Sequence, residues 1–441
     1  MNPERFISVV EVFGKREIKM TLWIFILILL ALLGTPLFII ISAIALLAFH
    51  SIEIDSSAIM IEMYRMASAP TLLAIPLFTF TGYLLAESNA PKRLMNLNSA
   101  LFGHLAGGTS IIVLLSCAFF TAFTGASGVT IIALGGLLFP ILLKEKYPNK
   151  FSLGLMTSSG SLGLLFPPSL PLILYGLVSK TNVDKLFIAG IIPGILMILI
   201  ISAYNIKVAQ VSQPLKSVFN FKEVFIASKE ASWEIPLPLI ILVGIYGGIF
   251  TVTEAAAVAA LYTLLTEVVI YKDLHLFKDV PRIMKESMIL IGGILIILGM
   301  AMGLTNYLID EEIPMKILAF MENHINSKLT FLMLLNIFLL IVGCMMDIFS
   351  AIIVVVPLVV PIAQSFGVDM VHLGIIFLTN LEIGYSTPPV GINLFIASSR
   401  FNKPVVELYR AVIPFLGLRL IGLIIITYFP WLSLALLNFF N

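Results

Sequence analysis

Small, hydroxyl-bearing and helix-breaking residues gather at four places inside otherwise apolar runs of this chain. A backbone break at such a place frees carbonyl and N–H groups from helical hydrogen bonds. Free carbonyls and Ser or Thr hydroxyls can coordinate a sodium ion, and the N-termini of half-helices attract a carboxylate. The candidate sodium- and substrate-binding residues are Gly125, Ser127, Gly128, Ser159, Gly160, Ser161, Pro167 and Pro168 in the first half, and Asp347, Ser350, Gly384, Ser386, Thr387, Pro388, Pro389 and Gly391 in the second.

A competing interpretation is that these residues only form packing kinks and close helix contacts. Two acidic residues bear on the choice, because an ionisable group inside a membrane indicates function. We expect Asp347 to support the ion or substrate site, whereas Glu382 fits either such a role or a buried hydrogen-bonding strut. Arg410 and Arg419 either extend toward the membrane surface or pair with a carboxylate.

The composition identifies the environment in which such a site would work. Of the 441 residues 59% are hydrophobic and only 12% are charged, which predicts a polytopic membrane protein with all-α structure. The net charge of +1 argues against a nucleic-acid partner. The two cysteines sit in apolar runs and no histidine pair has metal-ligand spacing, so we expect no transition metal and no cofactor.

The breaks recur at a constant offset of 221 residues, which indicates an internal duplication. Each copy is predicted to contain a re-entrant hairpin followed by a broken helix. The hairpins cover 107–143 and 329–364, and the broken helices cover 151–179 and 371–399. The matching pairs are Gly82 with Gly303, Pro140 with Pro361, Gly163 with Gly384, Pro167 with Pro388, and Pro168 with Pro389.

Charge indicates that the two copies are inverted. The stretch 144–150 carries three lysines, whereas its counterpart 365–371 carries no Lys or Arg. Basic loops stay on the cytoplasmic side, so these loops should lie on opposite sides. A topology with a cytoplasmic N-terminus places 19 Lys and Arg inside and 5 outside. The inside segments are 1–20, 90–106, 144–150, 207–233, 272–285 and 400–404, and the outside segments are 51–70, 180–185, 251–254, 309–328 and 365–371.

Three long motifs in a fixed order resemble those of a known transporter family. They are Gly247–Ala260, with the triplet Thr253-Glu254-Ala255, then Gly160–Gly176 and Leu381–Gly391. From about residue 21 to the end, the chain resembles the large membrane subunit of the tripartite ATP-independent periplasmic (TRAP) transporters. Val252 departs from the family pattern, which has proline there. Thr251 and Glu254 also form a capping-box pattern, which predicts a helix start.

The resemblance implies a multi-pass protein of the bacterial inner membrane and not an enzyme. Its partners would be a small membrane subunit of four helices and a periplasmic substrate-binding protein. Sodium would be the coupling ion, and the substrate an organic acid such as a C4-dicarboxylate or a sialic acid. An elevator mechanism would move the hairpins and broken helices against a scaffold. The segments would then be a surface or linker segment at 1–20, a scaffold helix and loop at 21–70, inverted repeats at 71–185 and 286–404, central scaffold helices at 186–285, and a C-terminal scaffold helix at 405–441.

Three alternatives remain. A stand-alone sodium–carboxylate symporter would have the same broken helices without partner proteins. An intramembrane serine protease could use Ser127 in the Gly125–Gly128 motif, but the order of His104 and Ser127 does not fit that class. An ion channel suits inverted hairpins with midplane breaks less well than a transporter.

Overall fold

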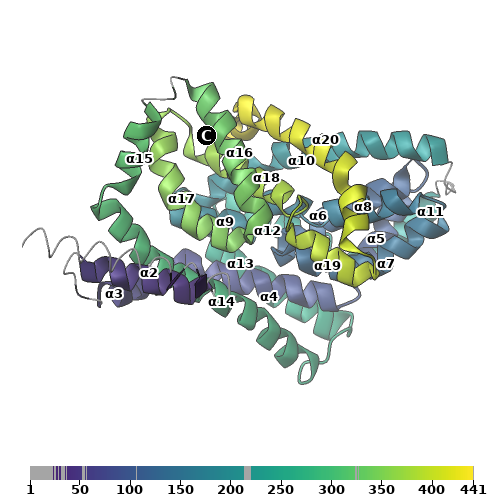
Figure 1. The fold of residues 1–441 in the computed structure, drawn as a ribbon. Helices are drawn as coiled ribbons and strands as arrows, with labels where there is room; N and C mark the ends of the chain where they lie inside the picture. The colour runs from purple at the N-terminus through teal and green to yellow at the C-terminus, as the bar shows by residue number, and fades with distance from the viewer. Residues whose placement is uncertain are drawn as a thin grey trace, which may run out of the picture. The chain divides into compact units, whose positions relative to one another are not determined.

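The computed structural model describes residues 23, 26–27, 29–30, 35, 37–51, 55, 57–105, 107–212, 220–322, 325 and 327–440. Over these residues the regular structure is helical, and no strand occurs (Figure 1). Eight helices of this part of the chain are long and apolar enough to cross a membrane, and a bent pair supplies a ninth candidate. The predicted all-α polytopic fold is therefore confirmed. The predicted surface segment 1–20 lies outside the described residues.

The described residues form two compact units, one from 1–68 with 293–316 and one from 69–292 with 317–441. The first unit contains α2 (Leu37–Ser51), α3 (Ser57–Ala67) and the end of α14 (Asp279–Asp310). Ala45 and Phe49 of α2 form its core with Met300 and Leu304 of α14. The Phe49 ring also meets Tyr307 edge to face at 6.2 Å. Apolar contacts between the helices therefore form the core of this unit.

The second unit contains the predicted hairpins and broken helices. Its helices are η1 (Pro70–Leu73), α4 (Ala74–Glu87), α5 (Ala90–Phe102), α6 (Gly108–Thr124), α7 (Ser127–Lys144), α8 (Asn149–Ser159), η2 (Leu162–Leu165), α9 (Leu170–Ser179), α10 (Val183–Ser212), α11 (Phe221–Glu230), α12 (Pro236–Tyr246), α13 (Val252–Leu265), the π-helix η3 (Thr266–Ile270), α16 (Lys328–Met345), α17 (Ile348–Ser365), α18 (Met370–Gly384), α19 (Ile392–Phe401), α20 (Val405–Tyr428) and α21 (Trp431–Phe440). The start of α14 belongs here too, and α15 (Ile313–Glu322) begins in the first unit and ends in the second.

Helix boundaries repeat with the offset found in the sequence. Helix α7 covers 127–144 and α17 covers 348–365, so both ends differ by 221 residues. The start of α6 at 108 and that of α16 at 328 differ by 220, and those of α8 and α18 by 221. The first predicted broken helix corresponds to α8, η2 and α9, with a bend of 46° between its halves. At the C-terminus, the predicted scaffold segment, which the sequence leaves open as one long helix or a bent pair, forms two helices with Pro430 between them.

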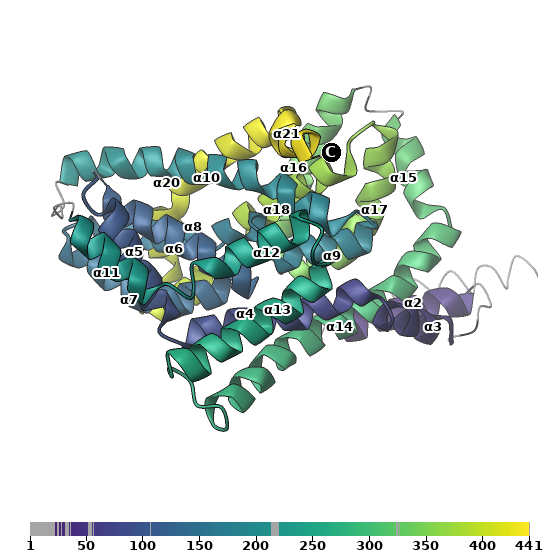
Figure 2. The ribbon, with the colours of Figure 1, turned by 180° about the vertical axis from the view of Figure 1, so that it is seen from behind.

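The two copies interlock through their hairpins. The second arm of the first hairpin, α7, packs against α19 of the second copy. The second arm of the second hairpin, α17, packs against α9 of the first copy in the same way. Within the second copy α16 packs against α18, and outside the hairpins α13 runs beside α4 (Figure 2). Each broken helix is therefore fixed by both copies.

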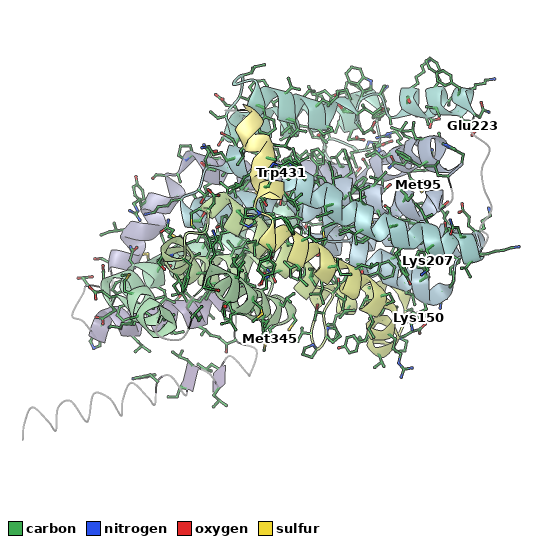
Figure 3. The ribbon with its side chains drawn as sticks, turned by 90° about the horizontal axis from the view of Figure 1, so that it is seen from above. Met95, Lys150, Lys207, Glu223, Met345 and Trp431 are labelled. Atoms are coloured by element: carbon green, nitrogen blue, oxygen red, sulfur yellow. The ribbon has the colours of Figure 1, made fainter. Side chains whose placement is uncertain are left out.

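Segments predicted to share one side of the membrane meet in this unit. Asn89, next to inside segment 90–106, donates from its backbone and its side-chain amide to Asp273 at 3.0 and 2.9 Å. Lys328 donates to the Gly367 carbonyl at 2.6 Å, which joins two outside segments. The cytoplasmic assignment of either side stays a prediction. Figure 3 shows four residues of predicted inside segments toward one end of the unit: Met95, Lys150, Lys207 and Glu223.

Arg93 of α5 forms ion pairs with three carboxylates of neighbouring segments. Arg93 donates to Glu267 at 2.8 Å, to Asp273 at 2.6 Å and to Glu234, and its guanidinium lies 3.7 Å from the centre of the Tyr271 ring. Burial by itself raises the pKa of Asp273, but hydrogen bonds from Asn89 and Arg93 outweigh it and hold that pKa below its usual range. Glu234 and Glu267 are almost fully buried, so removing Arg93 would leave their charges uncompensated.

We expect Arg93→Met to destabilise the protein by about 3–5 kcal/mol, because it breaks a buried ion cluster. Arg282→Met is the matched control, since Arg282 pairs with Glu87 and Glu286 where all three side chains are more than 40% exposed. Its loss should cost less than about 1 kcal/mol. Thermal unfolding of both variants in detergent measures the difference, and equal decreases in Tm would contradict a special role of the Arg93 cluster.

Candidate functional site

The tip of the first hairpin is a tight turn that only glycine fits well. Helix α6 ends at Thr124, and Gly125 follows with φ +63°, a conformation that side-chain-bearing residues rarely adopt. The Gly125 N–H donates to the Thr121 carbonyl at 2.8 Å, and α7 then begins at Ser127. A Cβ at position 125 would also lie 2.4 Å from a carbon of the Leu170 side chain. The turn therefore brings the hairpin tip against the start of α9.

Oxygen atoms cluster beneath this tip. Thr121 Oγ1 lies 2.7 Å from Thr130 Oγ1 and 2.7 Å from the Gly160 carbonyl oxygen. Thr124 Oγ1 lies 3.5 Å from Thr130 Oγ1 and 3.4 Å from the Ala126 carbonyl oxygen. All three threonines are buried. Uncharged hydroxyl and carbonyl oxygens are a donor set that fits a sodium ion, as at the unwound helices of other secondary transporters.

These threonines were not among the predicted site residues, although the Gly125–Gly128 break was. Thr121 and Thr124 lie one helical turn apart just before the break, and Thr130 follows just after it. That spacing places the Thr121 and Thr124 hydroxyls on one face of α6, toward the break, and is a signal that could have been used. Of the predicted residues, Gly160 contributes its carbonyl to the cluster, whereas Ser159 turns its hydroxyl back to the Leu155 carbonyl of α8 at 2.6 Å.

A second group of polar atoms joins the first hairpin to the break of the second copy. Ser127 Oγ donates to Asn393 Oδ1 at 2.7 Å, and the Asn393 backbone N–H donates to the Tyr385 carbonyl at 3.0 Å. The Asn393 Nδ2 and Ser386 Oγ atoms are buried and have no hydrogen-bond partner among the described residues. Buried donors of this kind suit a ligand oxygen such as that of a carboxylate. Asn393 was not among the predicted site residues.

The second hairpin has a different tip. Asp347 precedes α17 and accepts hydrogen bonds from the Phe349 and Ser350 backbone N–H groups, both at 3.0 Å, and from the Ser350 hydroxyl. This arrangement is a helix N-cap, so the carboxylate is occupied by its own helix. The Ile348 N–H donates to the Tyr385 hydroxyl, which ties the tip to the second break.

Close backbone contact fixes the second break against the hairpin. A Cβ at Gly384 would lie 2.4 Å from the Gly343 carbonyl carbon, so α16 and α18 can cross only at paired glycines. The Gly391 N–H donates to the Cys344 carbonyl at 3.0 Å. Both double prolines, Pro167–Pro168 and Pro388–Pro389, contain a cis peptide bond. The Thr387 hydroxyl returns to the Ile383 carbonyl within α18 at 2.9 Å.

Nine of the predicted residues fall into two groups. The structure brings Ser127, Gly160 and Ser161 into contact with partners that belong to other elements, and Gly125 and Gly128 pack against Leu170 and Ile396. The hydrogen bonds of the second group stay within one helix and the residues that flank it; its members are Ser159, Asp347, Ser350 and Thr387.

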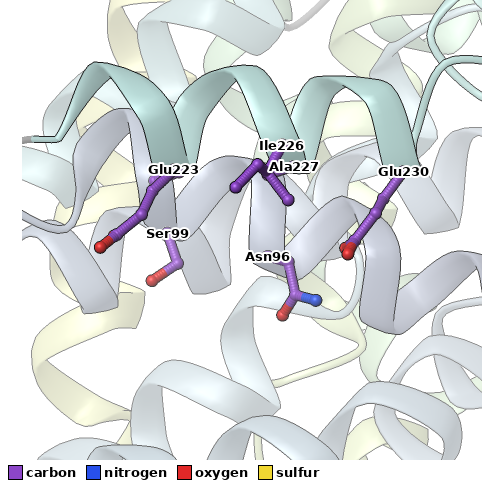
Figure 4. Close-up of a pocket in the computed structure, with 7 residues that line it drawn as sticks. Asn96, Ser99, Glu223, Ile226, Ala227 and Glu230 are labelled. Carbon is purple, nitrogen blue, oxygen red and sulfur yellow. The ribbon is translucent and has the colours of Figure 1, made fainter.

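Two cavities lie away from these breaks. One of about 260 Å³ lies along the packed helices α5 and α11, and its lining includes Asn96 and Ser99 of α5 and Glu223 and Glu230 of α11 (Figure 4). The other, of about 590 Å³, is lined by residues of three predicted outside segments, which end or begin at Pro70, Lys180 and Thr251. None of the predicted site residues lines either cavity.

Comparison with known proteins identifies the family. The profile of the tripartite ATP-independent periplasmic transporter, DctM component, matches residues 21–432. The chain belongs to this family. As a DctM component it is a transport protein of the membrane, so the serine protease alternative is wrong. The site agrees, because the Ser127 hydroxyl donates to an amide oxygen, which is not a base that could activate it.

Two relatives and one solved structure illustrate the similarity of this DctM chain. It is 38% identical over 397 residues to the C4-dicarboxylate TRAP transporter large permease protein DctM of Pseudomonas aeruginosa, covering 90% of this chain and 92% of that one. It is 35% identical over 361 residues to the isethionate TRAP transporter permease protein DctMQ of Oleidesulfovibrio alaskensis, covering 81% and 57%. The fold resembles the Alcanivorax borkumensis YdaH transporter, with a TM-score of 0.61, 12% identity, and 85% and 87% coverage.

Asp347 allows a test that separates its cap from an ion-binding role. Asp347→Asn keeps a side-chain acceptor for the N-cap, whereas Asp347→Ala removes it and should cost about 1 kcal/mol of stability. If the carboxylate also supports a sodium site, both variants should weaken sodium-dependent uptake. Normal sodium dependence in Asp347→Asn, with reduced thermal stability only in Asp347→Ala, would restrict Asp347 to the cap.

Proposed function

We propose that this DctM chain takes up a small organic acid across the bacterial inner membrane, driven by a sodium gradient. It would act as the large permease of a three-component system, with a small membrane subunit and a periplasmic substrate-binding protein as partners. The family is described as a tripartite transporter, which supports a system of three components. The DctMQ name of one relative that is longer than this chain supports a close association with the small subunit.

The observation that carries sodium coupling is the buried oxygen cluster at the first hairpin. Thr121, Thr124 and Thr130 supply hydroxyls, and Ala126 and Gly160 supply carbonyls. Each of these oxygens lies within 3.5 Å of at least one other oxygen of the cluster. The cluster contains no carboxylate, so it suits a monovalent ion better than a divalent one, which usually takes carboxylates. Groups of three or more His, Cys, Asp or Glu that could hold a metal do not occur among the described residues.

The substrate class follows from two observations. The relatives described above are named for C4-dicarboxylate and isethionate, which are both small organic anions. In this chain, the unpartnered donors Asn393 Nδ2 and Ser386 Oγ lie at the second break, where they could bind anionic oxygens. We therefore propose a carboxylate as substrate, with C4-dicarboxylates and sialic acids as the classes to be tested.

An elevator motion is the proposed mechanism. Hairpin helices α6, α7, α16 and α17 and broken helices α8, α9, α18 and α19 would move together, because each hairpin packs on the broken helix of the other copy. The helices outside these elements would form the scaffold. Sodium and substrate would then be enclosed at the breaks and carried across without a continuous pore.

Uptake into proteoliposomes tests the proposal. This chain would be reconstituted with its small subunit, an inward sodium gradient would be imposed, and purified binding proteins would be added with labelled succinate, sialic acid or isethionate. We expect uptake that requires both the gradient and a binding protein. Uptake without a binding protein would favour the stand-alone symporter, and uptake indifferent to sodium would contradict sodium coupling.

Thr121→Val and Thr130→Val test the oxygen cluster, since valine keeps the shape and removes the hydroxyl. Each should raise the sodium concentration for half-maximal uptake roughly tenfold, which corresponds to about 1.4 kcal/mol. Thr263→Val in α13 is the matched control, because Thr263 is equally buried and lies outside the breaks. A similar shift in all three variants would rule out the cluster as the sodium site.

A further inference from the structure

Arg419 is a fully buried arginine at the centre of the second unit. It lies on α20, which belongs to neither copy of the duplication, and has 0% exposure. Its Nη2 atom donates to Glu382 Oε1 at 2.6 Å, to the Glu382 carbonyl at 3.0 Å and to Ser161 Oγ at 2.9 Å. Its Nη1 atom donates to the Ser158 carbonyl at 3.3 Å. One guanidinium therefore contacts the broken helices of both copies.

The residues that it joins hold equivalent positions in the two copies. Ser161 and Glu382 differ by 221, the offset of the duplication, and the Ser161 hydroxyl donates to the Glu382 carbonyl at 3.2 Å. Equivalent residues of two related copies can touch only close to the axis that relates them. Arg419 thus approaches the place where the two breaks meet, beside the end of α8 and the last turn of α18.

A purely structural role does not account well for this ion pair. Burying two charges costs several kcal/mol each, and replacing such a pair by apolar residues is often neutral or stabilising. Here the pair is also incompletely satisfied, because Arg419 Nε and Glu382 Oε2 have no hydrogen-bond partner among the described residues. Apolar side chains would hold α20 against α8 and α18 at lower cost.

The position of the charge indicates what the pair does. The carbonyl ends of α8 and α18 carry negative partial charge, which Arg419 neutralises from one side for both helices. Gly160, whose carbonyl belongs to the oxygen cluster, lies between Ser158 and Ser161. A cation drawn into that cluster would compete with Arg419 for the same helix end, and the guanidinium would transmit the change to Glu382 and the second break.

We propose that Arg419 is a positioning residue that couples the breaks of the two copies. The second break, where the buried Ser386 hydroxyl has no hydrogen-bond partner among the described residues, would hold a second cation, so that a cation bound at one break changes the affinity of the other break for its own cation. This inference rests on the proposed sodium function. The coupling residue lies outside both repeats, and the coupling is reciprocal: each site changes the affinity of the other by the same factor.

Equilibrium binding of radioactive sodium to the full chain in detergent tests the coupling, with choline chloride keeping the ionic strength constant. The parent chain should give a sigmoidal curve with a Hill coefficient above 1. The double variant Arg419→Met with Glu382→Leu removes both charges and leaves none unpaired, and its Hill coefficient should fall to about 1. Arg410→Met is the control on the same helix, because Arg410 is exposed, and it should behave as the parent.

Each remaining outcome decides between the hypotheses. A double variant that keeps the parent's Hill coefficient, or a parent coefficient of 1, would overturn the coupling while leaving sodium binding in place. A parent chain that binds no sodium would overturn the proposed function itself. Should the double variant not purify as a folded protein, Arg419→Lys replaces it: it keeps the charge but loses the planar fork, and its Hill coefficient should fall below that of the parent.

Discussion

Inside a membrane, every backbone N–H and C=O group that leaves a helix must find another partner, and this constraint shapes the second unit of the protein. The breaks and the hairpin tips supply those partners to one another. The Gly160 carbonyl meets Thr121, the Gly391 N–H meets the Cys344 carbonyl, and the Asn393 N–H meets the Tyr385 carbonyl. The first break is surrounded almost entirely by protein, whereas Pro389 and Val390 of the second break are exposed. The same polar groups then become available to an ion or an anionic ligand.

The hairpins and broken helices of the two copies pack against each other. Helix α7 packs on α19 and α17 packs on α9, so each hairpin is in contact with the broken helix of the other copy. The two tips nevertheless differ in chemistry. The first presents threonine hydroxyls and carbonyls, whereas the second uses Asp347 to cap its own helix. Similar backbones thus carry different polar groups at the two tips.

Two arginines, Arg93 and Arg419, form ion pairs in different surroundings. Arg93 lies beside three carboxylates and a tyrosine ring, and it links α5 to the turn before α12, to η3 and to the segment after η3. Arg419 lies where the two copies meet, with one carboxylate and the carbonyl ends of two helices. In the first cluster three carboxylates surround a single arginine, so Arg93 is held by several ion pairs at once. The second has a balanced pair next to the proposed ion site, where a change in local charge can be transmitted.

The sequence alone determined the membrane environment, the duplication and the position of the breaks, because hydropathy, the 221-residue offset and Gly or Pro residues are properties of the chain itself. It also predicted the capping box of Thr251 and Glu254, which depends on residues three apart. It did not single out Thr121, Thr130 or Asn393, since a hydroxyl in a helix can bond either its own backbone or a distant group. The partner of Ser127 lies 266 residues away, and Arg419 could have extended to the surface or paired. Only the tertiary structure decided these contacts, because they depend on which helices the packing brings together.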